Sequence, residues 1–324
     1  MPEVTYISAI TSTLAEAMRA DRRVFVLGED VAEGGPFTAT AGLAEEFGTD
    51  RVINTPISEA AITGVAIGAA QSGQRPVLEI MYIDFITLAL DQLVNGAAKA
   101  HFMSGGQLTV PLVVRTQGGA GHRGGAQHSQ SLESWLTHVP GLKVVMPSRA
   151  VDAAGLLVAA IADPNPVVFI ENKTLYFRRE QVPDQPPAVR IGEAVTLREG
   201  RDVTIVALSR LVHDALAAAD RLAAEDGIEA EVIDPRTLVP LDLAAIVASV
   251  ERTGHLVVAH EAVEHGGFGA EIAAQVQAAA FDYLDAPIAR VGAPFAPIPL
   301  SAPLEDAYLP DADDIVEAVR RTLQ

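Results

Sequence analysis

Short apolar segments alternate with helix-forming segments along almost the whole chain. Residues 24–27 and 167–170 are apolar runs of the length of a buried strand, whereas residues 6–20 place apolar side chains at helical spacing. Repeated alternation of this kind is typical of parallel sheets whose strands are connected by helices. The pattern therefore predicts an α/β protein.

A proline-rich segment divides the expected elements into two groups. In the first group we expect strands at residues 24–27, 51–54, 76–80, 112–115, 142–145 and 167–170, and helices at 6–20, 43–47, 60–72, 85–103 and 151–162. In the second group we expect strands at 203–208, 230–233, 256–259 and 288–291, and helices at 213–224, 243–250 and 269–280. Residues 181–187 contain three prolines and favour neither helix nor strand. We therefore expect two domains, residues 1–184 and 185–324.

Composition narrows the class of protein. The chain has 324 residues, enough for two domains, and 49% of them are hydrophobic, yet no stretch of 18 apolar residues predicts a membrane span. The net charge of −19 argues against nucleic acid as a partner and is compatible with a basic protein partner. The absence of cysteine excludes disulfides, thiolate catalysis and zinc–cysteine sites. The first residues do not resemble a signal peptide, so we expect a cytoplasmic enzyme subunit.

The run Thr55-Pro56-Ile57-Ser58-Glu59 connects an apolar strand to a helix rich in small residues. It places a carboxylate in the first turn of a helix at the carboxyl end of a strand, where open α/β sheets bind their ligands. A glutamate in such a place can exchange a proton with a ring nitrogen. A purely structural alternative is that Ser58 caps the helix and Glu59 faces the positive end of the helix dipole.

Two further segments place polar or aromatic groups after expected strands. Phe85 follows the strand at residues 76–80, and a glycine-rich loop containing His122 and His128 follows the strand at residues 112–115. Such a loop can bring backbone and imidazole groups close to a ligand. A histidine in a loop is also often only a structural hydrogen-bonding group.

Several motifs occur in order along the chain. They comprise residues 55–59, Phe85, residues 103–106, 126–130, 140–145 and 163–167, followed by residues 234–238, 260–261 and 267–272. Together they resemble the beta subunit of the thiamine diphosphate-dependent, decarboxylating component of 2-oxo acid dehydrogenase complexes. The resemblance covers nearly the whole chain. It implies a pyrimidine-binding parallel-sheet domain followed by a transketolase C-terminal-like α/β domain.

The resemblance implies roles for individual residues. Glu59 would hydrogen-bond the aminopyrimidine ring of the cofactor and favour its imino tautomer. Phe85 would pack on the pyrimidine ring, and Ile57 and Met81 would line the same pocket. His128 would lie near the reacting carbon, where it could bind the substrate carboxylate, stabilise the intermediate or direct acylation of the lipoyl group.

The resemblance also implies a bound potassium ion. Its ligands would be main-chain carbonyl oxygens of Leu112, Ala160, Ile161, Asp163 and Asn165, and a hard cation needs several such oxygens. The alternative is that residues 160–165 form an ordinary helix C-terminal turn without a metal.

The sequence lacks the motif with which related enzymes hold the cofactor diphosphate. Related enzymes hold magnesium and the cofactor diphosphate on a Gly-Asp-Gly turn, but this sequence has no such tripeptide, and Asp226-Gly227 lacks the preceding glycine. The resemblance therefore implies that an alpha subunit holds the magnesium and the diphosphate. The expected assembly is an α2β2 heterotetramer with the cofactor at the interface between the subunits.

Three other features admit more than one interpretation. His260 and His265 resemble a zinc-peptidase pair, but their spacing is off by one residue, so we expect a strand end and a loop. Gly64 and Gly68 lie on one helix face that packs either on the chain's own sheet or on another subunit. The acidic residues near the C-terminus form either a solvated face or a docking patch for the acyltransferase core.

The function implied by this resemblance is decarboxylation of a 2-oxo acid, either pyruvate or a branched-chain acid, with reductive acylation of lipoamide on the acyltransferase core. The nearest alternative is the beta subunit of an acetoin-cleaving dehydrogenase with the same fold and cofactor. A single-chain transketolase-like enzyme is disfavoured by the missing diphosphate motif. A noncatalytic assembly subunit is the alternative from a different functional class.

Overall fold

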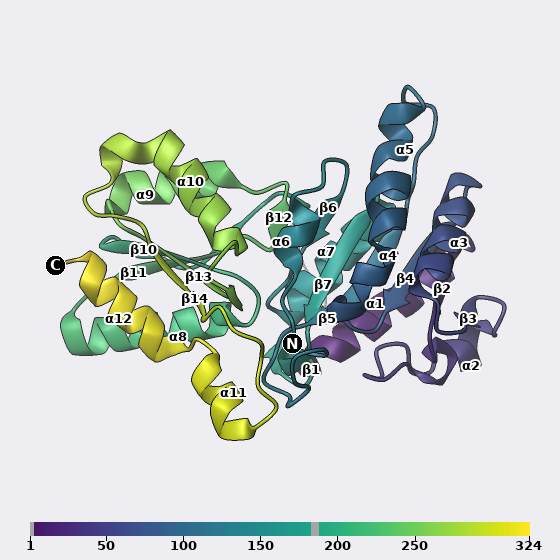
Figure 1. Cartoon of the computed structure of the whole chain (residues 1–324), viewed down its shortest axis with the longest axis horizontal. Coiled ribbons are helices and arrows are strands. Elements are labelled where there is room, and N and C mark those ends of the chain that lie inside the picture. Colours follow the sequence, from purple (N-terminus) through teal and green to yellow (C-terminus); the bar gives the residue numbers. More distant parts are fainter. Residues whose placement is uncertain (1–2, 183–187) are drawn as a thin grey trace. The chain divides into compact units, whose positions relative to one another are not determined.

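The computed structural model of the chain describes residues 3–182 and 188–324 (Figure 1), and contacts divide it into two units. Unit 1 runs to Gly118 and continues at Trp135–Ile191, and unit 2 comprises Gly119–Ser134 and Gly192–Gln324. The expected domain boundary at residues 184/185 lies outside the described residues. In the described part of the chain, no helix is both long and apolar enough to cross a bilayer.

Unit 1 is built around parallel strands. Its elements are β1 (Glu3–Thr5), α1 (Tyr6–Ala20), β2 (Val24–Gly28), η1 (Val31–Glu33), α2 (Leu43–Phe47), β3 (Val52–Asn54), α3 (Glu59–Gln71), β4 (Arg75–Ile80), η2 (Ile83–Phe85), α4 (Ile86–Asp91), η3 (Gln92–Ala97), α5 (Ala98–Met103), β5 (Val113–Gly118), β6 (Lys143–Val145), α7 (Ala150–Ala162), β7 (Val167–Asn172), η4 (Lys173–Leu175) and β8 (Arg179–Gln181). The strands pair in the order β6-β7-β5-β4-β2-β3, all parallel, and β1 pairs separately with β8 in antiparallel fashion.

This strand order creates a topological switch point. From β2 the chain passes outward to β3 at the edge and then returns through α3 to β4 on the other side of β2. The connection after β2 therefore runs toward β3, and the connection after β4 runs in the opposite direction, toward β5. Open α/β sheets bind ligands at the carboxyl ends of the strands on either side of such a point.

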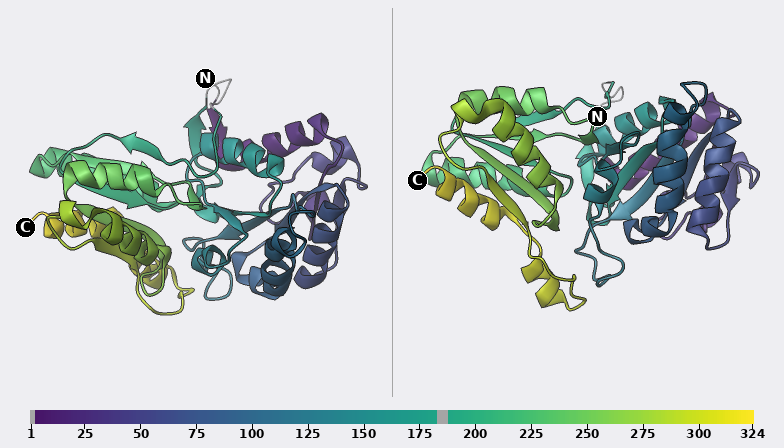
Figure 2. Two further views of the ribbon diagram at one scale, coloured as in Figure 1. Left: turned by 90° about the horizontal axis from the view of Figure 1, so that it is seen from above. Right: turned by 45° about the horizontal axis from the view of Figure 1, so that its top comes forward.

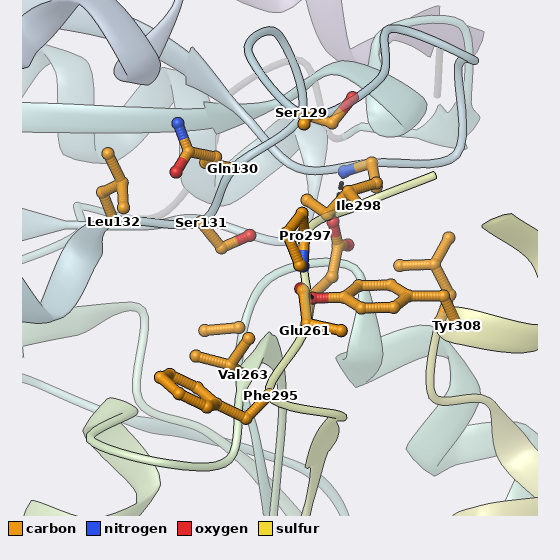
Figure 3. Close-up of a pocket in the computed structure, with 15 residues that line it drawn as sticks. Ser129, Gln130, Ser131, Leu132, Glu261, Val263, Phe295, Pro297, Ile298 and Tyr308 are labelled. Atoms are coloured by element: carbon orange, nitrogen blue, oxygen red, sulfur yellow. Dashed lines mark hydrogen bonds between the residues drawn. The ribbon is translucent and has the colours of Figure 1, made fainter. Parts of the chain in front are cut away.

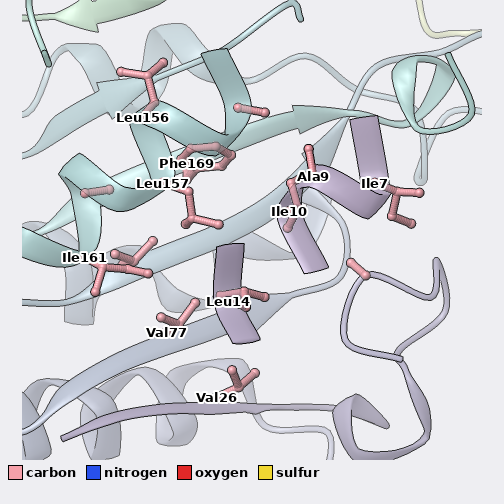
Figure 4. Close-up of a cluster of buried hydrophobic side chains, with 14 of the residues drawn as sticks. Ile7, Ala9, Ile10, Leu14, Val26, Val77, Leu156, Leu157, Ile161 and Phe169 are labelled. Carbon is pink, nitrogen blue, oxygen red and sulfur yellow. The ribbon is translucent and has the colours of Figure 1, made fainter. Parts of the chain in front are cut away.

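Helices cover both faces of the unit 1 sheet. Helices α1 and α7 pack together on one face, while α3 and the α4–α5 segment cover the other (Figure 2). Ile10 and Leu14 of α1 pack with Leu156 of α7 and Phe169 of β7 in a fully buried cluster (Figure 4). α1 starts at a capping box in which Thr5 and Ser8 exchange hydrogen bonds. The cap fixes the start of the helix directly before the first of its buried apolar side chains.

The helix expected at residues 85–103 is helical over most of its length but contains a π-helical turn, η3. Gln92, at the start of this turn, faces α3: a Cβ added to Gly64 would lie 3.3 Å from its Oε1. A Cβ on Gly68 would meet no described atom within 4 Å. The two glycines therefore differ, because Gly64 packs within the chain while Gly68 lies on an exposed part of the helix.

Unit 2 has a five-stranded sheet in the order β14-β13-β10-β11-β9, in which only β9 is antiparallel to its neighbour. Helices α8 and α12 pack on one face and α9 and α10 on the other (Figure 1). Its elements are β9 (Val195–Arg198), β10 (Val203–Ala207), α8 (Leu211–Asp226), β11 (Ala230–Asp234), β12 (Thr237–Val239), α9 (Leu243–Thr253), β13 (Leu256–Val263), α10 (Phe268–Ala280), η5 (Phe281–Tyr283), β14 (Ala289–Ala293), α11 (Ala302–Tyr308) and α12 (Ala312–Thr322), and α6 (Glu133–Thr137) spans the junction of the units.

Every strand and helix expected from the sequence is present, with ends that differ by a few residues. The expected linker starts too early, because Gln181 still belongs to β8 and pairs with Glu3. Seven elements were not predicted: β1, β8, β9, β12, α6, α11 and α12. Most of these are three to seven residues long, which is too short for apolar periodicity to be recognised.

A buried ion-pair network crosses three neighbouring strands of unit 1. Arg115 on β5 donates to Glu79 on β4 at 2.6 Å and to Glu171 on β7 at 2.7 and 2.8 Å, and Tyr176 donates to Glu171 at 2.5 Å. Burial lowers the pKa of Arg115, but the two carboxylates outweigh burial and hold it above its usual value. Burial raises the pKa of Glu79. One guanidinium thus compensates two buried carboxyl groups.

We expect Arg115→Met to destabilise unit 1 by about 3–5 kcal/mol, because it leaves Glu79 and Glu171 buried without a cation. The matched control is Arg19→Met, since Arg19 pairs with Glu46 on an exposed surface where ion pairs contribute little. Urea unfolding followed by circular dichroism should show a large shift for the first variant and almost none for the second. Equal shifts for both variants would contradict the importance of the buried network.

Candidate active site

The carboxyl ends of β2 and β3 bring two glutamates together beside the switch point. Glu29 follows the last residue of β2, and Glu59 is the first residue of α3, which follows β3. Glu59 is buried within the chain, and Glu29 is half-buried. Burial raises the pKa of Glu29, and the negative charges of Glu59 and Asp30 raise it further. The structure therefore places the predicted Glu59 in an acidic pair that sequence reasoning did not find.

The structural alternative for the Glu59 turn is not supported at Ser58. The Ser58 hydroxyl makes no capping bond to the helix and instead donates to the carbonyl of Pro56 at 3.2 Å. The hydroxyl of Thr63 donates to the Glu59 carbonyl at 2.7 Å. The first turn of α3 therefore has no side-chain cap at Ser58, and Glu59 still lies at the positive end of the helix dipole.

Aromatic rings line up beside this edge of the sheet. Phe85 is half-buried and meets the ring of Tyr82 edge-on at 5.8 Å, and Tyr82 meets Phe37 edge-on at 5.4 Å. Phe37 in turn packs on Tyr176 of the Arg115 network, with ring centroids 5.6 Å apart. Edge-to-face contacts of this kind fix ring orientation. Phe85 is thus held in place while part of its surface stays accessible.

The other predicted pocket residues differ in exposure. Met81, directly after β4, is half-buried, whereas Ile57 is 80% exposed in this chain. Ile57 therefore does not line a cavity formed by unit 1 alone. Its role in a cofactor pocket remains a prediction that requires another surface to cover it.

His128 lies in the long connection between β5 and α6. We call residues 119–132 the histidine loop; it contains both His122 and His128, and both side chains are half-buried. The His128 amide donates to the Gly125 carbonyl at 3.3 Å, which closes a tight turn just before the imidazole. The loop belongs to unit 2, whereas Glu59 and Phe85 belong to unit 1.

Unit 2 contains a cavity of about 360 Å³ bounded by the histidine loop (Figure 3). Its walls are mostly apolar and include Leu132, Val263, Phe295 and Ile298. Glu261 also lines it, and the Tyr308 hydroxyl beside it donates to the Ala296 carbonyl at 3.0 Å; the lining residues further comprise Ala120, Ala126, Ser129, Gln130, Ser131, Ala262, Pro297 and Leu309. Residues 126–130 and 260–261 were recognised as motifs in the sequence, but the sequence did not indicate that residues from both line one cavity.

The carbonyls expected to hold potassium lie around the end of α7. The Leu112 carbonyl accepts from the Val167 amide at 2.9 Å, and the Ile161 carbonyl accepts from Arg75 Nη1 at 2.6 Å. A guanidinium at this distance makes the Ile161 oxygen a poor cation ligand. The carboxylate of Asp163 forms an ion pair with Lys143 and accepts from the Asn165 amide at 2.9 Å.

The acidic residues near the C-terminus differ in exposure. Glu305 is completely buried, and the exposed Asp313 pairs with Arg221. Asp306, Asp311, Asp314 and Glu317 are also exposed, so a docking patch stays a prediction.

His260 lies inside β13, which continues to Val263, and burial lowers its pKa to about 4. Within residues 3–182 and 188–324, no three or more histidine, aspartate or glutamate side chains are grouped so that they could hold a metal ion.

Comparison with known proteins agrees with this geometry. Residues 2–178 match the transketolase pyrimidine-binding domain, and residues 192–315 match the transketolase C-terminal domain. The chain is 48% identical to the pyruvate dehydrogenase E1 component subunit beta-2 of Oryza sativa subsp. japonica, over 98% of this chain and 86% of that protein. The chain belongs to the transketolase-like E1 beta subunit family.

Other members of the E1 beta family are equally similar to this chain. It is 46% identical to the acetoin:2,6-dichlorophenolindophenol oxidoreductase subunit beta of Bacillus subtilis (strain 168), over 99% of this chain and 97% of that protein. Among solved structures, a split-gene transketolase described as an inactive beta4 tetramer superposes with a TM-score of 0.79. Its sequence is 27% identical to this chain, and the superposition covers 99% of this chain and 98% of the transketolase chain. The fold and the family predicted from the sequence are therefore confirmed.

Sequence reasoning missed Glu133, which is completely buried at the start of α6. Burial raises its pKa to about 7, and the negative charge of Glu261 contributes to the shift. Its Oε2 is buried and has no hydrogen-bond partner among the described residues. The neighbouring residues alone could not reveal this, because the burial of Glu133 depends on residues far away in the sequence.

We expect the Glu133 carboxyl to make stability depend on pH. A raised folded-state pKa means that the folded chain holds a proton which the unfolded chain releases between pH 4.5 and about 7. The wild type should therefore lose stability as pH rises through this window, by at most about 3 kcal/mol, whereas Glu133→Gln should not. The melting-temperature difference between variant and wild type should grow from pH 5 to pH 7.5 and then level off.

The exposed Glu45→Gln substitution is the matched control for Glu133→Gln, because it removes a carboxylate that already lies in water. A melting-temperature difference between Glu133→Gln and wild type that stays constant over this pH range would show that Glu133 does not hold the proton.

Proposed function

We propose that this chain is the beta subunit of an enzyme that uses thiamine diphosphate to decarboxylate a 2-oxo acid and to acylate lipoamide reductively. The observation that supports this most strongly is the buried Glu59 at the start of α3, beside Glu29 and the topological switch point. A buried acid at this edge is suited to proton exchange with a ligand in the crevice.

The residues of unit 1 fit the pyrimidine half of thiamine diphosphate. When bound, the cofactor supplies a carbon nucleophile that attacks the oxo group of the substrate. Glu59 would hold the aminopyrimidine through its ring nitrogen, Phe85 would pack on the ring, and Met81 would line the pocket. Burial and the negative charge of Glu59 both raise the pKa of Glu29, as expected for two acids at one ligand-binding edge. The half-buried Phe85 keeps ring surface available for packing.

We propose that His128 acts on the substrate side of the reaction. An imidazole can donate a hydrogen bond to a carboxylate or move a proton near neutral pH. It would bind the carboxylate of the 2-oxo acid or assist the transfer of the acyl group to a lipoyl-bearing acyltransferase core.

An alpha subunit is part of this proposal. The sequence has no Gly-Asp-Gly turn to hold magnesium and diphosphate, so another chain would supply them in an α2β2 assembly. Large apolar side chains support a partner surface on α3 and the α4–α5 segment: Val65, Leu88, Phe102 and Met103 are each more than half exposed, as is Ile57 just before α3. A partner that covers Ile57 would complete the cofactor pocket.

Potassium binding and localisation are further parts of the proposal. A potassium ion would use the carbonyls of Leu112, Ala160, Asp163 and Asn165. Those of Leu112 and Ala160 each accept one backbone amide and keep a second lone pair, whereas the Ile161 carbonyl is already engaged by the Arg75 guanidinium. We place the chain in the cytoplasm. The rice relative's name gives a mitochondrial protein, and the Bacillus subtilis name gives no compartment.

Acetoin cleavage is the second candidate function. It is supported by the Bacillus subtilis relative, whose 46% identity extends over almost the full length of both chains. Both reactions use the same buried acid and the same cofactor, so Glu59 does not distinguish them. A pocket wall that differs by one methylene contributes only about 1–3 kcal/mol to substrate choice.

We expect Glu59→Gln to lower turnover by about 10²–10⁴-fold in the complex with the alpha subunit, because the amide cannot exchange the proton. Glu45→Gln, an exposed acid in the first turn of α2, should leave turnover unchanged. Circular dichroism and thermal melting would check that both variants fold. Normal turnover of a folded Glu59→Gln complex would favour a noncatalytic assembly subunit.

We expect the purified chain alone to be inactive and the complex with an alpha subunit to be active. The reason is that the chain lacks the motif that holds the diphosphate. Assays of the complex with pyruvate, branched-chain 2-oxo acids and acetoin would identify the substrate from the highest kcat/KM. Activity of the single chain would contradict the need for a partner.

A further inference from the structure

The histidine loop has little intrinsic order. It contains four glycines, and Gly119, Gly121 and Gly125 have positive φ angles of 88°, 89° and 69°. Arg123 also adopts a left-handed conformation, with φ of 64°. Glycines gain much conformational freedom when a segment is released, so a loop of this composition is entropically costly to hold in one conformation. Part of its order must therefore come from contacts outside the loop.

Two buried carboxylates of unit 2 supply those contacts. The Ala120 amide donates to Glu261 Oε1 at 2.5 Å, and the Gly121 amide donates to Glu305 Oε1 at 3.0 Å. The Arg123 amide donates to Glu305 Oε2 at 3.2 Å, and its guanidinium donates to the same oxygen at 2.6 Å. Three backbone amides within four residues thus point at carboxylate oxygens. Charge-assisted bonds of this kind are stronger than bonds between neutral groups.

The dependence is mutual, because Glu305 is completely buried. If the loop left, this carboxylate would lose the hydrogen bonds from Gly121 and Arg123, and a buried carboxylate without its partners is strongly unfavourable. Glu261 is held from the other side by Arg210, whose Nε donates to Oε2 at 3.0 Å. Arg210 also donates to the Pro310 carbonyl at 2.9 Å, so the acceptor itself is rigidly placed.

The far end of the loop is fixed by its own backbone. The Gly119 amide donates to the Gln130 carbonyl at 3.1 Å, and the His128 amide donates to the Gly125 carbonyl at 3.3 Å. Only Gly124 separates Arg123, held by Glu305, from the turn that begins at Gly125 and ends at His128. The carboxylate contacts at residues 120–123 therefore lie within a few residues of the turn that carries the imidazole.

We infer that Glu305, together with Glu261, is a positioning residue that holds the histidine loop and thereby places His128 for the reaction. The inference rests on the proposed function of His128, but the anchoring of the loop is a separate physical claim. The exposed neighbour Asp306 provides a matched control. It pairs with the Arg123 guanidinium at 2.7 Å but accepts from no loop amide, and its side chain is 64% exposed.

The first test measures the loop in the purified full chain, without any assay of activity. In the wild type, hydrogen exchange at the amides of Ala120, Gly121 and Arg123 should be slow. Trypsin should cut slowly after Arg123, and Glu305→Gln should be cut there at least about tenfold faster. Asp306→Asn should behave like the wild type. Mass spectrometry identifies the expected fragments, residues 1–123 and 124–324.

The second test uses the complex with the alpha subunit. We expect Glu305→Gln to lower kcat about 10- to 100-fold, as expected for a misplaced catalytic group, with KM changed by less than about threefold. The double variant Glu305→Gln/His128→Ala should be no slower than His128→Ala alone, because Glu305 acts through His128. A merely structural role would make the two losses multiply.

Four results of these two tests on Glu305 and the loop would overturn the inference. They are fast exchange of the three amides in the wild type, unchanged trypsin cleavage of Glu305→Gln, wild-type turnover of that variant, and multiplying losses in the double variant. If Glu305→Gln does not fold, Glu261→Gln and the wild-type exchange rates decide the anchoring claim. Normal turnover of His128→Ala would overturn both the role of His128 in the proposed function and its positioning, whereas exchange and cleavage would still decide whether Glu305 anchors the loop.

Discussion

A buried carboxylate must be compensated, and this constraint organises the molecule. The chain has a net charge of −19, yet it buries several of its acids completely. Glu171 is compensated by Arg115, Glu231 by Arg252, and Glu305 by Arg123 together with two loop amides. Each of these acids ties together segments that are distant in the sequence. Carboxyl groups without such a cation stand out against this background.

Glu133 is the clearest exception among the described acids, because it is completely buried and burial raises its pKa to about 7. A second exception lies at one edge of the unit 1 sheet, where burial raises the pKa of Glu29 and the negative charge of Glu59 raises it further. These two acids are close because β2 and β3 are neighbouring strands, Glu29 follows β2, and Glu59 begins the helix after β3. An uncompensated acid at a switch point is better explained by a ligand than by stability.

The sequence was sufficient for the parts of the fold that local patterns determine. Alternating apolar strands and helices predicted both sheets, and Glu59 was found because it follows a strand and opens a helix. Glu29, Glu133 and Glu305 were missed because their burial arises only when distant segments pack. Glu305 shows this most clearly, since in the sequence it belongs to an acidic run typical of a solvated surface. The structure instead buries it beneath residues nearly two hundred positions earlier.

The backbone of the histidine loop adopts conformations that need glycine, yet the loop has to be held in one conformation. Its glycines let the backbone adopt left-handed conformations at Gly119, Gly121 and Gly125, which other residues would resist. The same glycines cannot hold any one conformation by themselves, so contacts from outside the loop add to the hydrogen bonds within its backbone. Carboxylates achieve this with direction as well as strength, because each oxygen accepts from a defined amide. A glycine-rich loop held in this way can place an imidazole accurately without using bulky side chains that would fill the space around a substrate.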